Sequence, residues 1–181
     1  MPCGAILTLD PQTDLAVREM WQLIEIAGLP SMMLQYDYPP HLTLAVCEDM
    51  DLDGLIAHLP SFIAAFPPLQ VDFPGVGVFS NIDPVVYLTV SRSPDLTSLH
   101  AAFWDLIGAY SSNLSQYYHP RAWVPHITLD QGMPLSLAGS IIDVLLRSPR
   151  PAAGLLFDIH LVDFDAGLQK NYSARLGSLL S

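Results

Sequence analysis

Apolar residues recur along this chain with two periods, one typical of strands and one typical of helices. Short apolar runs at 5–9 and 85–90 predict strands, the second because it is rich in β-branched residues. Asp10 and Pro11 predict a helix start, and the apolar spacing that follows predicts a helix as far as Gly28. Further apolar stripes at helical spacing predict helices over residues 55–66, 94–107 and 136–147.

Proline and glycine modify this pattern in two places. Pro60 lies inside the stripe at 55–66, so we expect two short helices or a kink there. Residues 70–79 alternate but contain two glycines, which favours a bent or bulged strand that forms a hairpin with 85–90. Residues 111–121 are predicted as the longest loop, and residues 157–163 and 172–176 as a closing strand pair.

One pentapeptide occurs twice, as Pro40-His41-Leu42-Thr43-Leu44 and as Pro125-His126-Ile127-Thr128-Leu129. If each copy is a strand, its His and Thr lie on one face and its two aliphatic residues on the other, because side chains alternate. The two copies could also be ordinary buried strands. Proline before and leucine after the His-x-Thr in both copies makes coincidence a weak explanation.

Strands and helices alternate twice around the two copies, which indicates a duplicated unit. We therefore expect an α+β fold with two antiparallel-sheet lobes, outer helices, and a central groove that carries both His-x-Thr motifs. No flexible linker separates the halves. Residues 1–181 are expected to form a single domain made of two intimately packed lobes.

Composition and charge limit the class of protein. The chain is 51% hydrophobic and 14% charged, which excludes global disorder. Its net charge is −11 with no basic stripe, so a nucleic-acid ligand would be a small nucleotide or an RNA 3′ end rather than a long strand. The chain shows neither a signal peptide nor an apolar run of membrane-spanning length. We expect a cytoplasmic monomer that does not contact membranes.

The paired motifs, together with residues 73–79 followed by 85–90, resemble the 2H phosphoesterase superfamily, which includes the 2′-5′ RNA ligase-like proteins and the cyclic nucleotide phosphodiesterases. The resemblance covers most of the chain. It implies that the two lobes are pseudo-symmetric, with a metal-independent active site in the central groove. It also implies phosphodiester substrates, often nucleoside 2′,3′-cyclic phosphates.

On this basis we predict an enzyme, a cyclic phosphodiesterase that hydrolyses 2′,3′-cyclic or related 2′-linked phosphodiesters of small nucleotides or RNA ends. This would be a role in RNA processing, and the family resemblance alone implies a 2′-phosphomonoester product. Two alternatives stay open: a non-catalytic module that binds nucleotides or RNA ends, and a 2′-5′ RNA ligase. Turnover of a cyclic nucleotide separates the first alternative from the enzyme.

Histidine titrates near neutral pH, so His41 and His126 can act as a general base and a general acid on the two sides of a phosphate. The sequence does not assign which does which. Thr43 and Thr128 would hold the non-bridging oxygens and stabilise the charge that builds on them. Two histidines without nearby cysteine or carboxylate ligands make a poor zinc site, so we expect neither a metal nor a cofactor.

Five further side chains near the motifs are candidates for binding substrate. Tyr36, Tyr38, Tyr118 and Trp123 could stack on a base, or could simply pack the strand ends. Arg121 could meet a phosphate, or could be a solvated surface residue. The remaining histidines lack a Thr two residues later and are interpreted as ordinary surface or edge residues: His58, His100, His119 and His160.

Overall fold

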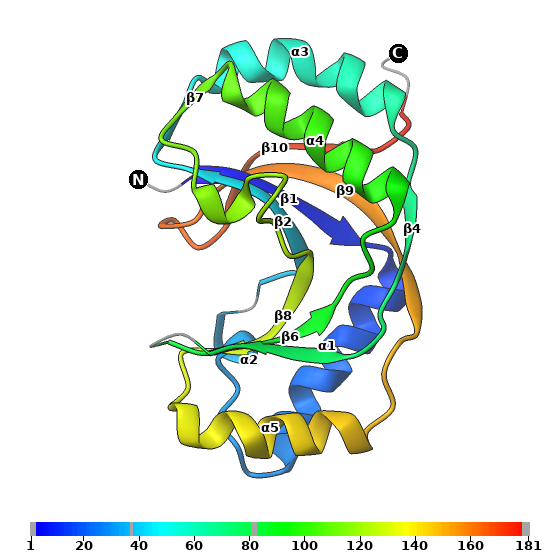
Figure 1. The fold of residues 1–181 in the computed structure, drawn as a ribbon, viewed down its shortest axis with the longest axis vertical. Helices are drawn as coiled ribbons and strands as arrows, with labels where there is room; N and C mark the ends of the chain where they lie inside the picture. The colour runs from blue at the N-terminus through cyan, green and yellow to red at the C-terminus, as the bar shows by residue number, and fades with distance from the viewer. Residues whose placement is uncertain (1–2, 37, 81–82, 179–181) are drawn as a thin grey trace.

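A computed structural model describes residues 3–36, 38–80 and 83–178 (Figure 1). The helices are α1 (Pro11–Ile26), α2 (Met32–Tyr36), α3 (Leu52–Ala65), α4 (Pro94–Gly108) and α5 (Leu135–Arg147), with a 3₁₀ turn η1 (Gln116–Tyr118). The strands are β1 (Cys3–Leu9), β2 (His41–Cys47), β3 (Asp49–Met50), β4 (Leu69–Asp72), β5 (Val76–Phe79), β6 (Val85–Thr89), β7 (Ser111–Ser112), β8 (His126–Gln131), β9 (Ala153–Asp163) and β10 (Gln169–Arg175).

One antiparallel sheet runs through the part of the chain that the structure describes, in the order β10-β9-β1-β2-β8-β6-β5, with β4 also paired to β9. Its two halves meet where β2 pairs with β8, in a ladder with one registered pair, Leu42 with Ile127. Helices α3 and α4 cover one half, whereas α1, α2 and α5 surround the other (Figure 1). The predicted α+β fold with two antiparallel lobes and outer helices is confirmed.

The helix starts follow the predicted capping chemistry. The Asp10 carboxylate accepts hydrogen bonds from the backbone N–H groups of Gln12 and Thr13, and Pro11 occupies the first turn of α1. Helix α3 runs through Pro60 as one element, so the prediction of two separate helices is wrong. Its buried apolar face is continuous on both sides of the proline, and that burial outweighs one lost backbone hydrogen bond.

The segment 70–79 is not one bent strand, and this prediction is corrected. β4 pairs with β9 in one half of the sheet, and β5 pairs with β6 in the other as the predicted hairpin. Pro74 lies between the two strands, where it cannot donate to a ladder. The segment 111–121 is not a plain loop either, because β7 pairs with β3 and η1 follows it. The closing strand pair is confirmed as β9 and β10.

The alternation within the repeated pentapeptide is confirmed. Leu42, Leu44, Ile127 and Leu129 are all completely buried in the main core, while the His and Thr of both copies remain partly accessible on the other face. Within the described residues, none of the helices has both the length and the apolar character needed to span a bilayer.

Candidate active site

The four polar side chains of the repeat line one pocket of about 470 Å³. His41 and Thr43 reach it from β2, and His126 and Thr128 reach it from β8. The strands are neighbours in the sheet, and an alternating side-chain pattern aims both pairs at the same face. The structure therefore brings together residues far apart in the sequence, in a cavity of a size that suits a small organic ligand.

Each histidine ring is held in the same way, by its own chain. The Nδ1 of His41 lies 2.8 Å from the carbonyl oxygen of Pro39, and the Nδ1 of His126 lies 2.7 Å from that of Val124. A carbonyl oxygen only accepts, so each Nδ1 carries the hydrogen and donates it. The Nε2 atom of each ring is left to take up or release a proton.

Burial lowers the pKa of both imidazoles below the ordinary histidine value. The positive charge of protonated His126 lowers the pKa of His41 further. The pocket lining holds no Lys or Arg among the residues described. In the free protein the site is therefore nearly neutral at pH 7, and a bound anion would favour protonation of a ring because opposite charges attract.

Tyr118 extends the polar face of the pocket. Its phenol hydrogen-bonds with the side chain of Thr43, and burial raises the pKa of that phenol. It consequently stays protonated near neutral pH and retains a donor beside the first His-x-Thr motif.

The five predicted substrate contacts divide into two groups. Tyr38, Tyr118 and Trp123 line the pocket. Tyr36 does not line it and instead stacks on Tyr38 with ring centroids 5.2 Å apart. Arg121 is exposed and also lies outside the lining.

Several lining residues escaped the sequence analysis: Met33, Phe79, Val85, Ala122, Val124, Gln131, Phe164 and Leu168. A register shift in the pairing of β6 with β8 falls between Val86 and Tyr87, and this irregularity lets Gln131 share the pocket face with Thr128. One signal was present in the sequence, because an aromatic residue precedes both motif histidines by three positions, as Tyr38 and as Trp123.

Two of the histidines interpreted as surface or edge residues are buried, and that interpretation is corrected. His100 stacks on Trp123 and its Nε2 donates to the carbonyl of Leu44 at 3.1 Å, while burial lowers its pKa to about 4. His160 lies between the hydroxyls of Thr8 and Ser173, and burial lowers its pKa to about 4 as well. Both side chains are neutral structural groups at pH 7.

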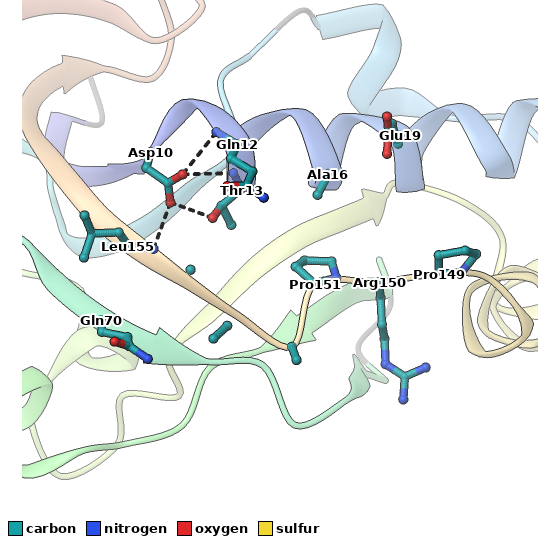
Figure 2. A pocket seen from close by; sticks show the side chains of 13 residues that line it. Asp10, Gln12, Thr13, Ala16, Glu19, Gln70, Pro149, Arg150, Pro151 and Leu155 are labelled. Atoms are coloured by element: carbon teal, nitrogen blue, oxygen red, sulfur yellow. Dashed lines mark hydrogen bonds between the residues drawn. The ribbon is translucent and has the colours of Figure 1, made fainter.

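A second hollow of about 710 Å³ lies at the start of α1 (Figure 2). Asp10 lines it, and its carboxylate accepts from the Thr13 hydroxyl at 2.6 Å and from the backbone N–H of Leu155 at 2.9 Å. Glu19 and Arg150 lie on opposite sides of the hollow and do not converge (Figure 2). The hydrogen bonds of Asp10 attach the start of α1 to β9, so we assign no chemistry to the hollow. Over the described ranges, no three His, Cys, Asp or Glu side chains gather in a way that could hold a metal ion.

A two-lobed α+β fold with two His-x-Thr strands meeting at one pocket defines the 2H phosphoesterase class. A family model described as the 2′-5′ RNA ligase superfamily matches residues 13–168, and the chain belongs to this family.

Curated relatives agree with this assignment, and solved structures share the fold. A Bacillus cereus (strain B4264) protein named "Putative phosphoesterase BCB4264_A1283" is 29% identical over 98 residues, covering 52% of this chain and 53% of the relative. The chain thus spans about half the length of the curated relatives it matches. TT0787 of Thermus thermophilus has a TM-score of 0.58 at 17% identity, with 98% of each chain covered. Kluyveromyces marxianus Usb1 has a TM-score of 0.55 at 10% identity, with 97% of each chain covered. These two likenesses concern the fold.

Proposed function

We propose that this protein hydrolyses 2′,3′-cyclic phosphodiesters, on small nucleotides or at RNA 3′ ends, without a metal. His41 and His126 are the general acid and base, one each. The observation that carries the proposal is the pair of Nε2 atoms left available by two matching Nδ1–carbonyl hydrogen bonds at one pocket. One neutral imidazole deprotonates the attacking water, and one imidazolium protonates the leaving ribose oxygen.

Thr43 and Thr128 donate their hydroxyls to the non-bridging oxygens of the phosphate. These donors are fixed on strands, so no solvent has to reorient as negative charge builds on those oxygens. Tyr118 hydrogen-bonds with the side chain of Thr43 and thereby orients that hydroxyl toward the phosphate. The water-derived oxygen ends on phosphorus and the leaving oxygen becomes a ribose hydroxyl, so atoms and protons balance with water alone as co-reactant.

The charge of the pocket favours a diester over a monoester. With no Lys or Arg in the described lining, an imidazolium is the main positive charge that meets the phosphate. It balances the single negative charge of a cyclic diester, whereas a phosphomonoester product carries nearly two charges at pH 7. This mismatch would favour release of the product.

The aromatic lining supports a nucleoside as the rest of the substrate. Tyr38, Tyr117 and Phe164 come from three separate segments around the pocket, where their rings could take a base by stacking. The structurally similar Kluyveromyces marxianus Usb1 has been solved with uridine monophosphate, at a TM-score of 0.52. Tyr36 and Arg121 lie outside the pocket lining, so within the proposal they contact only a longer substrate that extends past the pocket.

The experiment is hydrolysis of the four nucleoside 2′,3′-cyclic monophosphates in EDTA, with the product regiochemistry read by chromatography. We expect turnover by the wild type and losses in kcat of roughly 10²–10⁴-fold in both His41→Ala and His126→Ala. His58→Ala is the matched control, because this exposed histidine contacts Tyr110 and lies outside the pocket. Its activity should equal that of the wild type.

Three results would overturn the proposal: no turnover of any cyclic nucleotide, activity abolished by EDTA, or full activity in either pocket variant. Formation of a 2′-5′ linkage from a cyclic phosphate end and a 5′ hydroxyl, in the absence of hydrolysis, would identify a ligase instead. Binding of a cyclic nucleotide without turnover would identify a binding module.

A further inference from the structure

Two buried tryptophans make the same contact on the two motifs. The indole N–H of Trp123 donates to the backbone carbonyl of Thr43 at 3.0 Å, and the indole N–H of Trp21 donates to that of Thr128 at 3.2 Å. Both side chains are at most 2% exposed. Each catalytic threonine therefore has its backbone, and not only its side chain, fixed by a hydrogen bond from outside the sheet.

These carbonyls lie beside the shortest ladder of the main sheet. Thr43 follows Leu42 and Thr128 follows Ile127, and those two preceding residues form the one registered pair between β2 and β8. Buried carbonyls need a hydrogen-bond partner, and a ladder this short leaves few backbone donors between these strands. The two indoles supply donors to the residue that follows this registered pair on each strand.

The two contacts cross between the repeats. Trp123 belongs to the segment that leads into the second motif, yet it holds the first. Trp21 lies on α1, which precedes the first motif, yet it holds the second. The position of each Thr relative to the other motif is thus set by a side chain from the other repeat.

Further contacts hold the side chain and the backbone of Trp123 in place. One face of its indole lies against the His100 ring, with centroids 3.7 Å apart and planes 3° apart. Its carbonyl oxygen accepts from the guanidinium of Arg92 at 3.4 Å, and the same guanidinium binds the carbonyl of Pro120 at 2.7 Å. The ring face, the indole N–H and the backbone carbonyl of Trp123 are all engaged. We therefore interpret Trp123 as a fixed support for the first motif, and not as a ring that moves to stack on a base.

We propose that Trp21 and Trp123 are positioning residues, whose indole N–H groups set the separation of the two His-x-Thr motifs across the pocket. This inference rests on the proposed hydrolysis at the same site. Losing one hydrogen bond would let one strand shift by a fraction of an ångström, which misaligns acid, base and phosphate donors. Misplacement on this scale reduces the chemical step far more than it reduces binding.

The test replaces each tryptophan in turn with β-(3-benzothienyl)alanine, in which sulfur takes the place of the indole N–H while the shape of the ring is kept. Trp104 is the matched control, since its ring contacts His119 edge-on at 5.5 Å and lies outside the pocket lining. The measurements are kcat and KM per folded molecule, and the titration of the His41 and His126 rings by NMR in the free protein. Trp21→Phe and Trp123→Phe repeat the test with ordinary residues.

We expect a fall in kcat of about tenfold or more at positions 21 and 123, with KM changed less than about threefold, and altered titration of the two pocket rings. Substitution at position 104 should change none of these. Equal effects at all three positions, or an unchanged kcat per folded molecule, would overturn the inference. If the wild type fails to hydrolyse cyclic nucleotides, the proposed function fails. The NMR titration still decides the inference, because unchanged ring titrations at positions 21 and 123 would overturn it.

Discussion

Replacing Asp130 with asparagine should stabilise the protein at neutral pH. Asp130 is completely buried on β8, and its Oδ1 accepts the backbone N–H of Met32 at 2.9 Å. Its Oδ2 and the hydroxyl of Ser31 have no hydrogen-bond partner among the described residues. Burial raises the pKa of the Asp130 carboxyl above its ordinary value, so the fold favours the neutral form. Asparagine keeps an acceptor for Met32 and removes the buried charge.

The size of the gain follows from the cost of a buried charged group with an unsatisfied atom, about 1–2 kcal/mol. For a chain of this length that corresponds to a rise in melting temperature of roughly 3–6 °C. The sign depends on pH. Because the native pKa of Asp130 is raised, the wild type is penalised above that pKa, and the penalty disappears below the unfolded value of 3.8.

The assay is urea and thermal unfolding of the wild type and Asp130→Asn from pH 3.5 to 8. Asp143→Asn is the control, because that exposed carboxylate pairs with Arg147 and should change stability by less than about 0.5 kcal/mol. A destabilised Asp130→Asn at pH 7, or a gain of the same size at pH 3.5, would refute the reasoning. Activity should be retained, since Asp130 does not line the pocket.

Three further outcomes are expected. Because the pKa values of His41 and His126 are lowered, the maximum of kcat/KM should lie on the acid side of the ordinary histidine value of 6.5. Well above that pH, kcat/KM should fall about tenfold per pH unit. A pH–rate profile with its maximum above neutrality would contradict this. Asp10→Ala removes the α1 cap and the bond to Leu155, so urea titration should show a loss of about 2–3 kcal/mol. Tyr118→Phe should lower kcat about tenfold with little change in the circular dichroism spectrum, and an unchanged kcat would remove Tyr118 from the mechanism.

The sequence correctly predicted the features that depend on interactions between neighbouring residues. Alternation alone assigned Leu42 and Ile127 to the core and the motif histidines to the opposite face, because strand side chains have no other choice. The Asp10-Pro11 helix start was readable for the same reason, since capping involves residues within one turn. The convergence of the two motifs was inferred from their duplication rather than from any local property.

The features that the sequence did not predict depend on contacts between residues that are distant in the sequence. The burial of His100 depends on Trp123 and Leu44, which are distant in sequence, and nothing around residue 100 signals it. The division of residues 70–79 between two halves of the sheet depends on which strand edges are available, and periodicity does not carry that information. The register shift that brings Gln131 to the pocket is invisible for the same reason.

The path of the chain between the two halves of the sheet has a consequence for how the protein is made. β1 lies between β2 and β9, so β1 and β2 are both made long before β9 covers the second edge of β1. β4 also waits for β9, although β5, only a few residues later, belongs to the other half. Neither half is therefore an uninterrupted stretch of sequence that a ribosome could release already folded. Pairing strands that are distant in the sequence costs loop-closure entropy, and this cost arises only after the late strands have been made. We therefore expect slow folding and a single cooperative unfolding transition.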